Sequence, residues 1–531
     1  MMIQFVVTGY WMFLFTFLLA NLLILALNFL SFFQLRETSV APEPEAALPL
    51  LSILVPARNE EQCIEACIRS LVAQTYQRLE VIVLDDNSSD TTGSIVQGIV
   101  DELAPTQAGR LRLLQGASLP EGWIGKNYAC HQLSQHAIGD YFFFTDADTV
   151  HASGAARAVI ACMQQLEVKL LTAQPEFELG SLGECLVVPL LNFTIMTLLP
   201  VALVRLRPEA SLATGNGQLL CFQRSAYEKI GGHAAVKGNI LEDVLLARAV
   251  KKVGDRMAFV DAMDVVRCRM YRSFSEVWSG FSKNLFAFYN YALPFALGAL
   301  LLNLALFVVP PLLALAAFLL HLSTSVVVSG ASAYLLAVVM RVLLTLRFTR
   351  QRHALALLLA LCLLHPLSIG LECLILLNSI RCHYQGTGVS WKGRQYNRQN
   401  ASKGRNSGSE IVAMRQVNQA KHEDIRKIEQ DWNIQRQGYP SGKHGRENAG
   451  VAIRAKRKTS IDAQSLHAIG EEGYYQRCKQ PTRSIFIHQR DRYHQSFENE
   501  QDASCPAHRE GRMHIKGEAN NRYGKGDTEN P

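Results

Sequence analysis

Two long stretches of this 531-residue chain contain no charged side chain, and they constrain its fold more than any other feature. No Asp, Glu, Lys or Arg precedes Arg36, and none occurs from Asn284 to Met340. A transmembrane helix needs about 20 consecutive apolar residues. The first stretch therefore predicts one spanning helix at about Tyr10–Phe33. It lacks the basic start and short apolar core of a cleaved signal peptide, so we interpret it as an anchor.

The second uncharged stretch has room for two more spans, at about Ala292–Leu320 and Ser325–Leu346. A fourth apolar segment, Ala354–Ile380, is interrupted by a His-Pro pair and carries Glu372. An ionisable residue in a span fits either a functional group or a satisfied packing feature. The sequence thus predicts about four transmembrane helices.

Basic residues follow the first and third predicted spans, and this bias places the region from Arg36 to about Asn290 in the cytoplasm. Basic residues also follow the fourth segment, where a simple count of crossings puts the chain outside. The side of the C-terminal tail therefore stays open, and the fourth segment is a candidate re-entrant helix.

The tail from 397 to 531 differs from the rest, with one leucine, Leu466, in 135 residues. Such a polar segment cannot bury enough apolar surface to offset the entropy of ordering, so we predict a disordered polar tail. The net charge of +7 is unevenly spread, and no nucleic-acid partner is expected. Cys63 and Cys67, four residues apart on a predicted helix, are expected to pack rather than to bind metal.

Between the anchor and the second uncharged stretch, strand patterns alternate with helix patterns. Strict alternation predicts an α/β domain with a mixed, mostly parallel sheet covered on both faces. Strands are predicted at 50–56, 79–86, 111–116 and 140–148, and helices at 60–74, 91–103, 125–137 and 152–166.

Carboxylates stand at the ends of two predicted strands, Asp85 and Asp86 at one and Asp146 and Asp148 at the other. The carboxyl ends of parallel strands form the ligand-binding edge of such a sheet. Four carboxylates there would repel one another unless something positive lies among them. A divalent cation bound to phosphate oxygens fits, because hard cations take oxygen ligands. A solvated turn would explain the DxD sequence taken alone.

Five segments then occur in a familiar order, namely "SILVPARNEE", "VIVLDDNSSDTT", "GWIGKNYA", "FFFTDADT" and "LEDVLLARAV". On these segments the chain resembles a family 2 glycosyltransferase of the GT-A fold. It is most similar to the membrane-anchored subgroup that glycosylates lipids such as carotenoids and hopanoids. The resemblance runs from about Leu50 to Tyr396 and includes the closing "SWKGRQY". It implies an anchor at 1–36, a GT-A (Rossmann-like) nucleotide-sugar-binding domain at 48–290 and C-terminal helices at 291–382.

The resemblance also implies roles at the donor site. One carboxylate of the DxD motif would face the ribose, and Asp148 in particular would bind Mn²⁺ or Mg²⁺ on the diphosphate, with Asp146 beside it. Lys126 would offer positive charge to the nucleotide, although an exposed lysine at a helix start is the alternative. The residues implied to bind the nucleotide sugar are Pro56, Arg58, Glu60, Asp85, Asp86, Lys126 and Asp146.

Glu242 and Asp243 begin a segment with helical spacing, where carboxylates also suit the helix dipole. The resemblance makes the second of the pair, Asp243, the general base that takes the proton of the acceptor hydroxyl. An inverting transfer needs one such carboxylate, because the metal stabilises the leaving diphosphate. The residues implied to lie near the acceptor are Gly215, Asn216, Gly217, Gln218 and Lys283.

One departure concerns the region "RSFSEVWSGFSKNLF", which lacks the QxxRW motif of processive polysaccharide synthases. Its absence argues against a polymerising enzyme. The apolar segment at 186–206 is interrupted by prolines and ends in arginines. It fits a helix in the membrane interface, which would favour a lipid acceptor, or a buried core helix.

The sequence therefore predicts a multi-pass membrane protein that moves a single sugar from a nucleotide-sugar donor to a lipid-like acceptor hydroxyl by inversion. The bilayer, the donor and the lipid are its expected partners. Three alternatives stay open. They are a polysaccharide synthase or polyprenyl-phosphate glycosyltransferase, a catalytically inactive membrane scaffold, and a binding protein that acts through its tail.

Overall fold

The computed structural model of the protein describes residues 2–36, 48–105, 109–352, 354–386, 389–392 and 394–396. The chain divides at Ile428 into two units, and every described residue belongs to the first. The predictions made for the tail at 397–531 lie outside the described residues.

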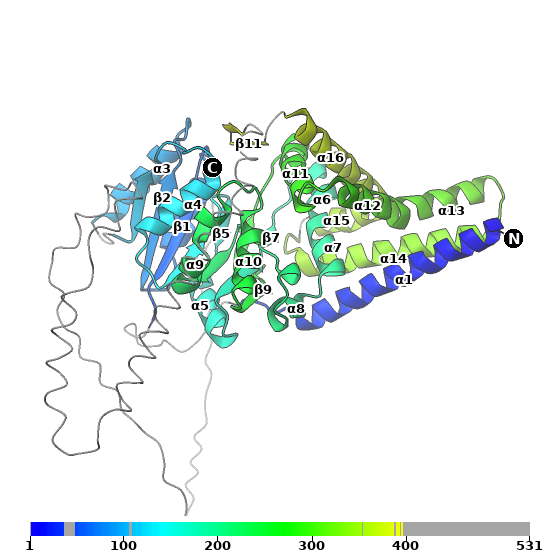
Figure 1. Cartoon of the computed structure of the whole chain (residues 1–531), viewed down its shortest axis with the longest axis horizontal. Coiled ribbons are helices and arrows are strands. Elements are labelled where there is room, and N and C mark those ends of the chain that lie inside the picture. The colour runs from blue at the N-terminus through cyan, green and yellow to red at the C-terminus, as the bar shows by residue number, and fades with distance from the viewer. Residues whose placement is uncertain are drawn as a thin grey trace, which may run out of the picture. The chain divides into compact units, whose positions relative to one another are not determined.

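A seven-stranded mixed sheet forms the centre of the domain that lies between the apolar segments (Figure 1). Its strand order is β3-β2-β1-β4-β8-β6-β9, and β8 is the one strand that runs antiparallel to its neighbours. The predicted mixed, mostly parallel sheet is confirmed. Its strands are β1 (Leu51–Ala57), β2 (Leu79–Asp85), β3 (Leu111–Gln115), β4 (Tyr141–Phe144), β6 (Leu170–Gln174), β8 (Leu220–Gln223) and β9 (Met257–Asp261).

Helices cover both faces of the sheet, as the apolar strands require. The phenylalanines of β4 show this division, because Phe143 packs in one core and Phe142 and Phe144 pack in the other. Successive side chains of a strand point to opposite faces. The helices on the Phe143 face are α2 (Ile64–Val72), α3 (Thr92–Leu103) and α5 (Ala155–Gln165), and those on the opposite face are α4 (Gly125–His136) and α10 (Glu242–Lys252).

A second, three-stranded sheet has the order β5-β10-β7 and follows directly from the end of β4. Its strands are β5 (Thr149–His151), β10 (Val266–Cys268) and β7 (Glu176–Phe177). The remaining short elements of the domain are η2 (Ala210–Leu212), α9 (Arg224–Lys229) and η3 (Gly232–Val236).

Four described helices are long and apolar enough to cross a membrane, at Gln4–Ser31, Leu293–Leu319, Thr324–Phe348 and Leu355–Gln385. Each overlaps one of the predicted spans. Prolines explain the two irregular ones, because proline lacks the N–H that continues a helix. The helices are α1 (Met2–Ser31), α12 (Leu293–Asn303), η4 (Leu304–Val308), α13 (Val309–Leu319), α14 (Thr324–Phe348), α15 (Leu355–Leu361), η5 (Cys362–Leu364) and α16 (His365–Gln385).

The apolar helices are fixed to the edge of the main sheet at β9. The ring of Phe32, just after α1, lies 5.3 Å from that of Phe259 on β9 and 6.2 Å from that of Phe348 at the end of α14. Arg347 of α14 forms an ion pair with the buried Asp261 of β9. The domain and the first and third apolar helices therefore form one packed body.

The segment predicted as an interfacial or core helix at 186–206 forms three short helices, α6 (Leu182–Val187), α7 (Pro189–Leu198) and α8 (Val201–Leu206). Asn28 of α1 holds the break between the last two. Its Nδ2 donates to the carbonyls of Met196 and Leu199 at 2.9 and 2.8 Å. Its Oδ1 accepts from the backbone N–H of Val201 at 2.9 Å. This segment thus packs against the anchor helix, while Leu182, Leu198 and Leu206 are exposed.

Both ends of the fourth apolar segment contact the α/β domain. Before it, the backbone N–H of Arg350 donates to Glu176 at 2.9 Å. After it, a hairpin of β11 (Val389–Trp391) and β12 (Arg394–Tyr396) returns to the domain, and Lys392 pairs with Glu60 at 2.9 Å. α15 and α16 between them are separated by the 3₁₀ turn η5, just before His365-Pro366.

Candidate active site

One lysine joins carboxylates from two distant parts of the sequence at the carboxyl edge of the main sheet. Lys126, at the start of α4, lies 2.7 Å from Asp146 Oδ1 after β4 and 3.0 Å from Glu242 Oε1 at the start of α10. Burial opposes the charged form, but Asp146 and Glu242 still hold the pKa of Lys126 well above its usual value. Lys126 is therefore not an exposed lysine at a helix start but part of an ionic cluster.

A buried hydrogen-bond network holds the loop that carries the DxD sequence. Thr145 Oγ1 donates to the carbonyl of Gln218 at 2.8 Å, and Thr149 Oγ1 donates to that of Asp146 at 2.8 Å. The Nε2 atom of His151 lies 3.1 and 3.0 Å from these two hydroxyls. Burial lowers the pKa of His151 to about 3, so the imidazole is neutral and shapes the loop without adding charge.

Asp148 and Asp243 are carboxylates of this site whose pKa values are strongly raised. Burial is the main cause for Asp148, with Asp146 and Glu60 adding repulsion, and its pKa is raised to about 7. Burial is again the main cause for Asp243, with Glu242 next, and its pKa is also raised to about 7. The Cys268 thiol donates to Asp148 Oδ1 at 3.5 Å. Carboxylates poised to gain or lose a proton near neutral pH are typical of functional sites.

The site formed by Lys126, Asp146, Asp148, Glu242 and Asp243 is called the carboxylate cleft, and two further lysines contribute to its electrostatics. Lys283 lies on α11 (Phe274–Phe288), the helix that leads into the second apolar segment. Burial and then Lys126 lower its pKa, while Glu242 and Asp146 act in the opposite direction. Lys392 comes from the C-terminal hairpin and pairs with Glu60. Elements from both ends of the α/β domain, and from beyond the last apolar helix, therefore contribute charge to one place.

The balance of charges in this cleft favours the binding of a divalent cation. When all are ionised, the carboxylates of Glu60, Asp146, Asp148, Glu242 and Asp243 carry five negative charges, against three positive charges on the lysines 126, 283 and 392. The raised pKa values of Asp148 and Asp243 reduce this excess of two at neutral pH, and a bound cation would restore it. No group of three or more His, Cys, Asp or Glu side chains within the described ranges is arranged to hold a metal ion by itself. A cation here would thus need substrate oxygens as well, which is how Mg²⁺ usually binds. Asp148 fits best, because Asp146 is already paired with Lys126.

The predicted nucleotide side of the cleft lies at the ends of β1 and β2. Asp85 is buried, and its Oδ1 accepts from the backbone N–H of Ser88 at 2.9 Å. Its Oδ2 also lies against Gly93, where a Cβ atom would come within 2.7 Å. Asp85 therefore shapes the turn after β2 instead of facing the cleft. Asp86 is buried as well, and its backbone N–H donates to the carbonyl of Ala57 at 2.8 Å.

Arg58 ties three segments together at this end. Its Nη1 donates to the backbone carbonyls of Asp86 and Asn87, the latter at 2.7 Å, and its Nε donates to the carbonyl of Lys392 at 3.2 Å. Pro56 is buried within β1. The structure places these predicted nucleotide residues together, with Arg58 in a supporting position behind the strand ends.

Lys392 is the main residue of the cleft that the sequence prediction did not assign to the site. Although burial lowers it, its pKa is raised overall by the pairing with Glu60 and by Asp148. The only sequence signal was the closing segment "SWKGRQY". Lys392 lies more than 330 positions beyond Glu60 and follows four apolar helices. Nothing in the local sequence indicates that the chain returns there to the end of the first strand.

The glycine-rich loop predicted near the acceptor lies beside the ionic cluster. A Cβ atom on Gly217 would lie 2.8 Å from Lys126 Nζ, and one on Gly215 would lie 2.5 Å from the backbone of Asp243. Glycine is required at Gly215, where the close neighbour is backbone, whereas the end of the flexible Lys126 side chain could shift away from a Cβ atom at position 217. Asn216 Oδ1 accepts from the backbone N–H of Gln218 at 3.1 Å, and the Oε1 atom of the buried Gln218 lacks a partner within the described structure.

Comparisons with known proteins fit this arrangement. Residues 52–185 match the family described as "Glycosyl transferase family 2", so the chain contains a family 2 glycosyltransferase domain. The match covers the strands and helices from β1 to the start of α6 and includes Lys126, Asp146 and Asp148.

Particular relatives carry the name "4,4'-diaponeurosporenoate glycosyltransferase". The protein from Staphylococcus haemolyticus (strain JCSC1435) is 27% identical over 244 residues, which is 44% of this chain and 60% of the relative. The protein from Staphylococcus aureus (strain USA300) is 26% identical over 248 residues, again 44% of this chain and 60% of the relative. The matched region therefore spans 60% of the length of these curated relatives.

Among solved structures, the chain is similar to one described as mannosyltransferase PcManGT from Pyrobaculum calidifontis in complex with GDP-Man and Mn²⁺. The identity is 18%, the TM-score is 0.42, and the alignment covers 70% of this chain and 97% of that one.

Proposed function

We propose that this protein is a membrane-bound, inverting glycosyltransferase that moves a single sugar from a nucleotide-sugar donor to a lipid-like acceptor hydroxyl. The observation that carries the proposal is the pairing of one lysine, Lys126, with both the DxD loop and the acidic start of α10. This pairing brings a diphosphate-binding feature and a proton acceptor into one cleft. The named relatives support a carotenoid or similar lipid as the acceptor.

On the donor side, Asp148 would hold a divalent cation, Mn²⁺ or Mg²⁺, together with oxygens of the donor diphosphate. When bound, the cation supplies positive charge that stabilises the departing diphosphate. Lys126 and Lys392 lie close to the carboxylates of the cleft, and their positive charges would partly neutralise the diphosphate as the donor enters. Their electrostatic effect is strongest where the cleft is shielded from water.

On the acceptor side, Asp243 would accept the proton of the attacking hydroxyl. Its pKa of about 7 suits this role, because a general base works best when its pKa lies near the operating pH. Glu242 is paired with Lys126, which keeps it engaged and leaves Asp243 as the available base. A single carboxylate base is consistent with inversion at the sugar carbon.

We propose a membrane arrangement in which the first three apolar helices cross the bilayer and the fourth enters and leaves it on the side of the α/β domain. Support comes from the contacts of Arg350 and Lys392, at either end of that segment, with the same domain. It would also reconcile the basic residues after this segment with a cytoplasmic domain. A tag inserted after His321 should be accessible only from outside, and one inserted after Gln385 only from the cytoplasm. Labelling of both tags from the same side would overturn this arrangement.

The test of the proposed reaction is the size and identity of its product. The full chain in detergent is incubated with UDP-glucose, UDP-GlcNAc or GDP-mannose, Mn²⁺ and a lipid extract that contains carotenoid or hopanoid alcohols. Mass spectrometry of the lipid phase should show the addition of one sugar unit, a hexose from UDP-glucose or GDP-mannose or an N-acetylhexosamine from UDP-GlcNAc. A ladder of sugar units would support the polysaccharide synthase alternative, and a sugar carried on polyprenyl phosphate would support the other one.

A further inference from the structure

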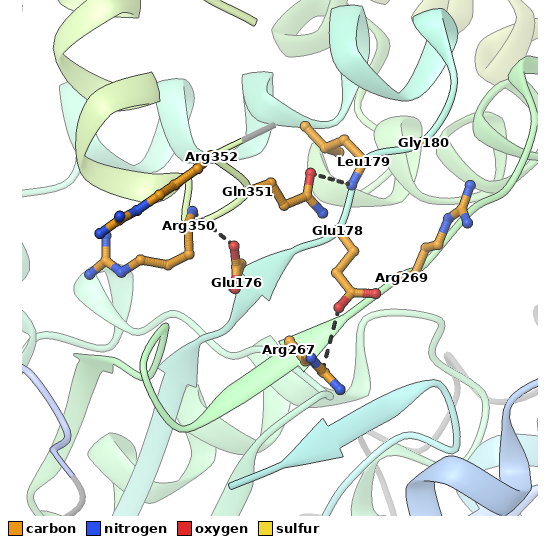
Figure 2. Close-up of a pocket in the computed structure, with 9 residues that line it drawn as sticks. All are labelled: Glu176, Glu178, Leu179, Gly180, Arg267, Arg269, Arg350, Gln351 and Arg352. Atoms are coloured by element: carbon orange, nitrogen blue, oxygen red, sulfur yellow. Dashed lines mark hydrogen bonds and ion pairs between the residues drawn. The ribbon is translucent and has the colours of Figure 1, made fainter. Parts of the chain in front are cut away.

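A second cavity lies outside the carboxylate cleft, between the three-stranded sheet and the loop that joins α14 to α15 (Figure 2). Its volume is about 510 Å³. That is within the range of cavities that bind small polar molecules. Four arginines and two glutamates line it, Arg267, Arg269, Arg350, Arg352, Glu176 and Glu178.

This arginine pocket holds four guanidinium groups that keep unused hydrogen-bond donors. Glu178 pairs with Arg267 at 3.4 Å, and Glu176 accepts from the backbone N–H of Arg350 at 2.9 Å. Both lining carboxylates are thus engaged. Glu184 and Asp264 are not part of the lining, but they pair with Arg269 at 3.4 Å and with Arg350 at 3.0 Å. Among the described residues, Arg352 is therefore the lining arginine whose guanidinium has no carboxylate partner. Each guanidinium carries five N–H donors, and a single ion pair uses only one or two of them.

Arg350 and Arg352 are the residues best placed to receive a ligand. Figure 2 shows their guanidinium groups on the same side of the pocket. Arg350 uses its Nε for Asp264 at 3.0 Å and its Nη1 for the carbonyl of Arg347 at 3.1 Å. The side chain of Arg352 makes no hydrogen bond or ion pair with any other residue that the structure describes, and Arg352 is exposed. A guanidinium group can bind phosphate in a bidentate manner, through two parallel N–H···O hydrogen bonds.

The place of the pocket along the chain indicates the source of that phosphate. α14 ends at Phe348 and the next apolar helix begins at Leu355, so the loop between them lies where the chain leaves one membrane helix and enters another. This level is occupied by lipid headgroups. Basic pockets at the cytoplasmic end of membrane helices attract anionic lipids.

The pocket is separate from the donor cleft, although the two share strand β10. Cys268 of that strand contacts Asp148 in the cleft. Its neighbours Arg267 and Arg269 line the pocket instead, as the alternation of side chains along a strand requires. A donor diphosphate held near Asp148 would therefore not fill the pocket.

We propose that the arginine pocket binds the phosphate group of an anionic phospholipid headgroup, with Arg350 and Arg352 as its main contacts. This inference rests on the membrane arrangement and not on the sugar transfer, so binding and catalysis are tested apart. An anionic lipid in this position would fix the α/β domain against the bilayer surface beside the candidate active site.

The experiment is native mass spectrometry of the full chain in detergent, titrated with phosphatidylglycerol or phosphatidylcholine. Wild type should retain phosphatidylglycerol at concentrations at which phosphatidylcholine is lost. Arg352→Gln should weaken phosphatidylglycerol binding about tenfold, and the double variant with Arg350→Gln should abolish the preference. Arg352 is the more informative single change, because it has no described partner whose loss could disturb packing.

The matched control is the double variant Arg224→Gln and Arg256→Gln, which removes two exposed arginines from ion pairs elsewhere on the domain. It should bind phosphatidylglycerol as wild type does. Equal binding by wild type and the Arg350/Arg352 variant, or no lipid preference in wild type, would overturn the proposal. Displacement of the lipid by millimolar inorganic phosphate as readily as by short-chain phosphatidylglycerol would identify free phosphate as the ligand and overturn the lipid assignment.

Discussion

The ends of β2 and β4 carry similar pairs of carboxylates, yet the fold uses them in opposite ways. After β2, Asp85 turns inward, where it accepts a backbone N–H and lies against a glycine of α3. After β4, Asp146 and Asp148 face the cleft, where one meets a lysine and the other a thiol. The carboxylate of Asp85 is thus used within the fold, whereas that of Asp148 is left without a cationic side-chain ion pair among the described residues.

This difference indicates that a carboxylate at a strand end is available to a ligand only when no ion pair or backbone hydrogen bond within the protein already occupies it. The pKa values express the same contrast. Burial and like charges raise the pKa of Asp148 to about 7, which costs the folded protein free energy. The unfavourable burial and repulsion at Asp148 would be relieved by a bound cation, whereas Asp85 has no such need.

The largest effect is expected at Asp148. Asp148→Ala should lower turnover by about 10²–10³-fold, the usual loss when a main electrostatic contact to the transition state is removed. Wild type should bind Mn²⁺ tightly in the presence of a nucleoside diphosphate, and the variant should not, as measured by electron paramagnetic resonance. Thermal stability should be kept or raised, since an unfavourable buried charge is lost. A variant that retains Mn²⁺ binding would show that Asp148, after β4, is no more functional than Asp85, at the end of β2.

Asp243→Asn should be nearly as damaging to turnover, by about 10²-fold, at the lower end of the usual contribution of a general base, because the proton acceptor is removed. Wild-type activity should rise with pH through about 7, as Asp243 loses its proton.

The same variant has a stability signature with a definite sign. The carboxyl titrates at 3.8 in the unfolded chain and at about 7 when folded. Between those values the folded protein holds a proton that the unfolded chain has lost, so wild type loses stability as the pH rises across this window. Asp243→Asn removes that loss. Its melting temperature should exceed that of wild type at pH 8, and the gap should shrink toward pH 4. A variant that is less stable at pH 8 would contradict the raised pKa.

A smaller effect is expected at Lys392, which reaches the cleft from the C-terminal hairpin. Lys392→Ala should raise the KM for the nucleotide sugar about tenfold, with a lesser change in kcat, because a charge near the donor is lost. Lys229→Ala removes an exposed lysine with a single carboxylate partner and should behave as wild type. An unchanged KM for Lys392→Ala would limit the hairpin to a structural role.

The smallest catalytic effect is expected at Asp85, which sharpens the contrast between the two strand ends. Asp85→Asn should lower the free energy of unfolding by about 1–3 kcal/mol, the cost of weakening a buried charged acceptor. Turnover per folded molecule should change little. If Asp85→Asn instead lost activity to the same degree as Asp148→Ala without loss of stability, the two strand ends would be equivalent.

Much of the fold could be predicted from local patterns. The apolar runs at β1, β2 and β4 and the uncharged membrane segments are long and regular, so periodicity alone located them. β6, β8, β9 and the three-stranded sheet were not predicted. The strands of that small sheet, β5, β7 and β10, have two or three residues each, too few to give a pattern.

The candidate site was predictable where motif and strand end coincide, as for Asp146 and Asp148. It was not predictable where tertiary contacts decide. Asp85 looks like its neighbour Asp86 in sequence, and only the turn to Ser88 shows that its carboxylate is used within the fold. Lys392 lies beyond four apolar helices, and no local property of the sequence could bring it to Glu60.

The most direct test of the central claim is release of nucleoside diphosphate from the donor by the detergent-solubilised full chain. It is measured with Mn²⁺, with Mg²⁺ and with a chelator, for wild type, Asp148→Ala and Asp243→Asn. We predict release by wild type only with a divalent cation, and loss of release in both variants. Cation-independent release, or variants as active as wild type, would contradict the assignment of this carboxylate cleft as the place where the donor is bound and cleaved.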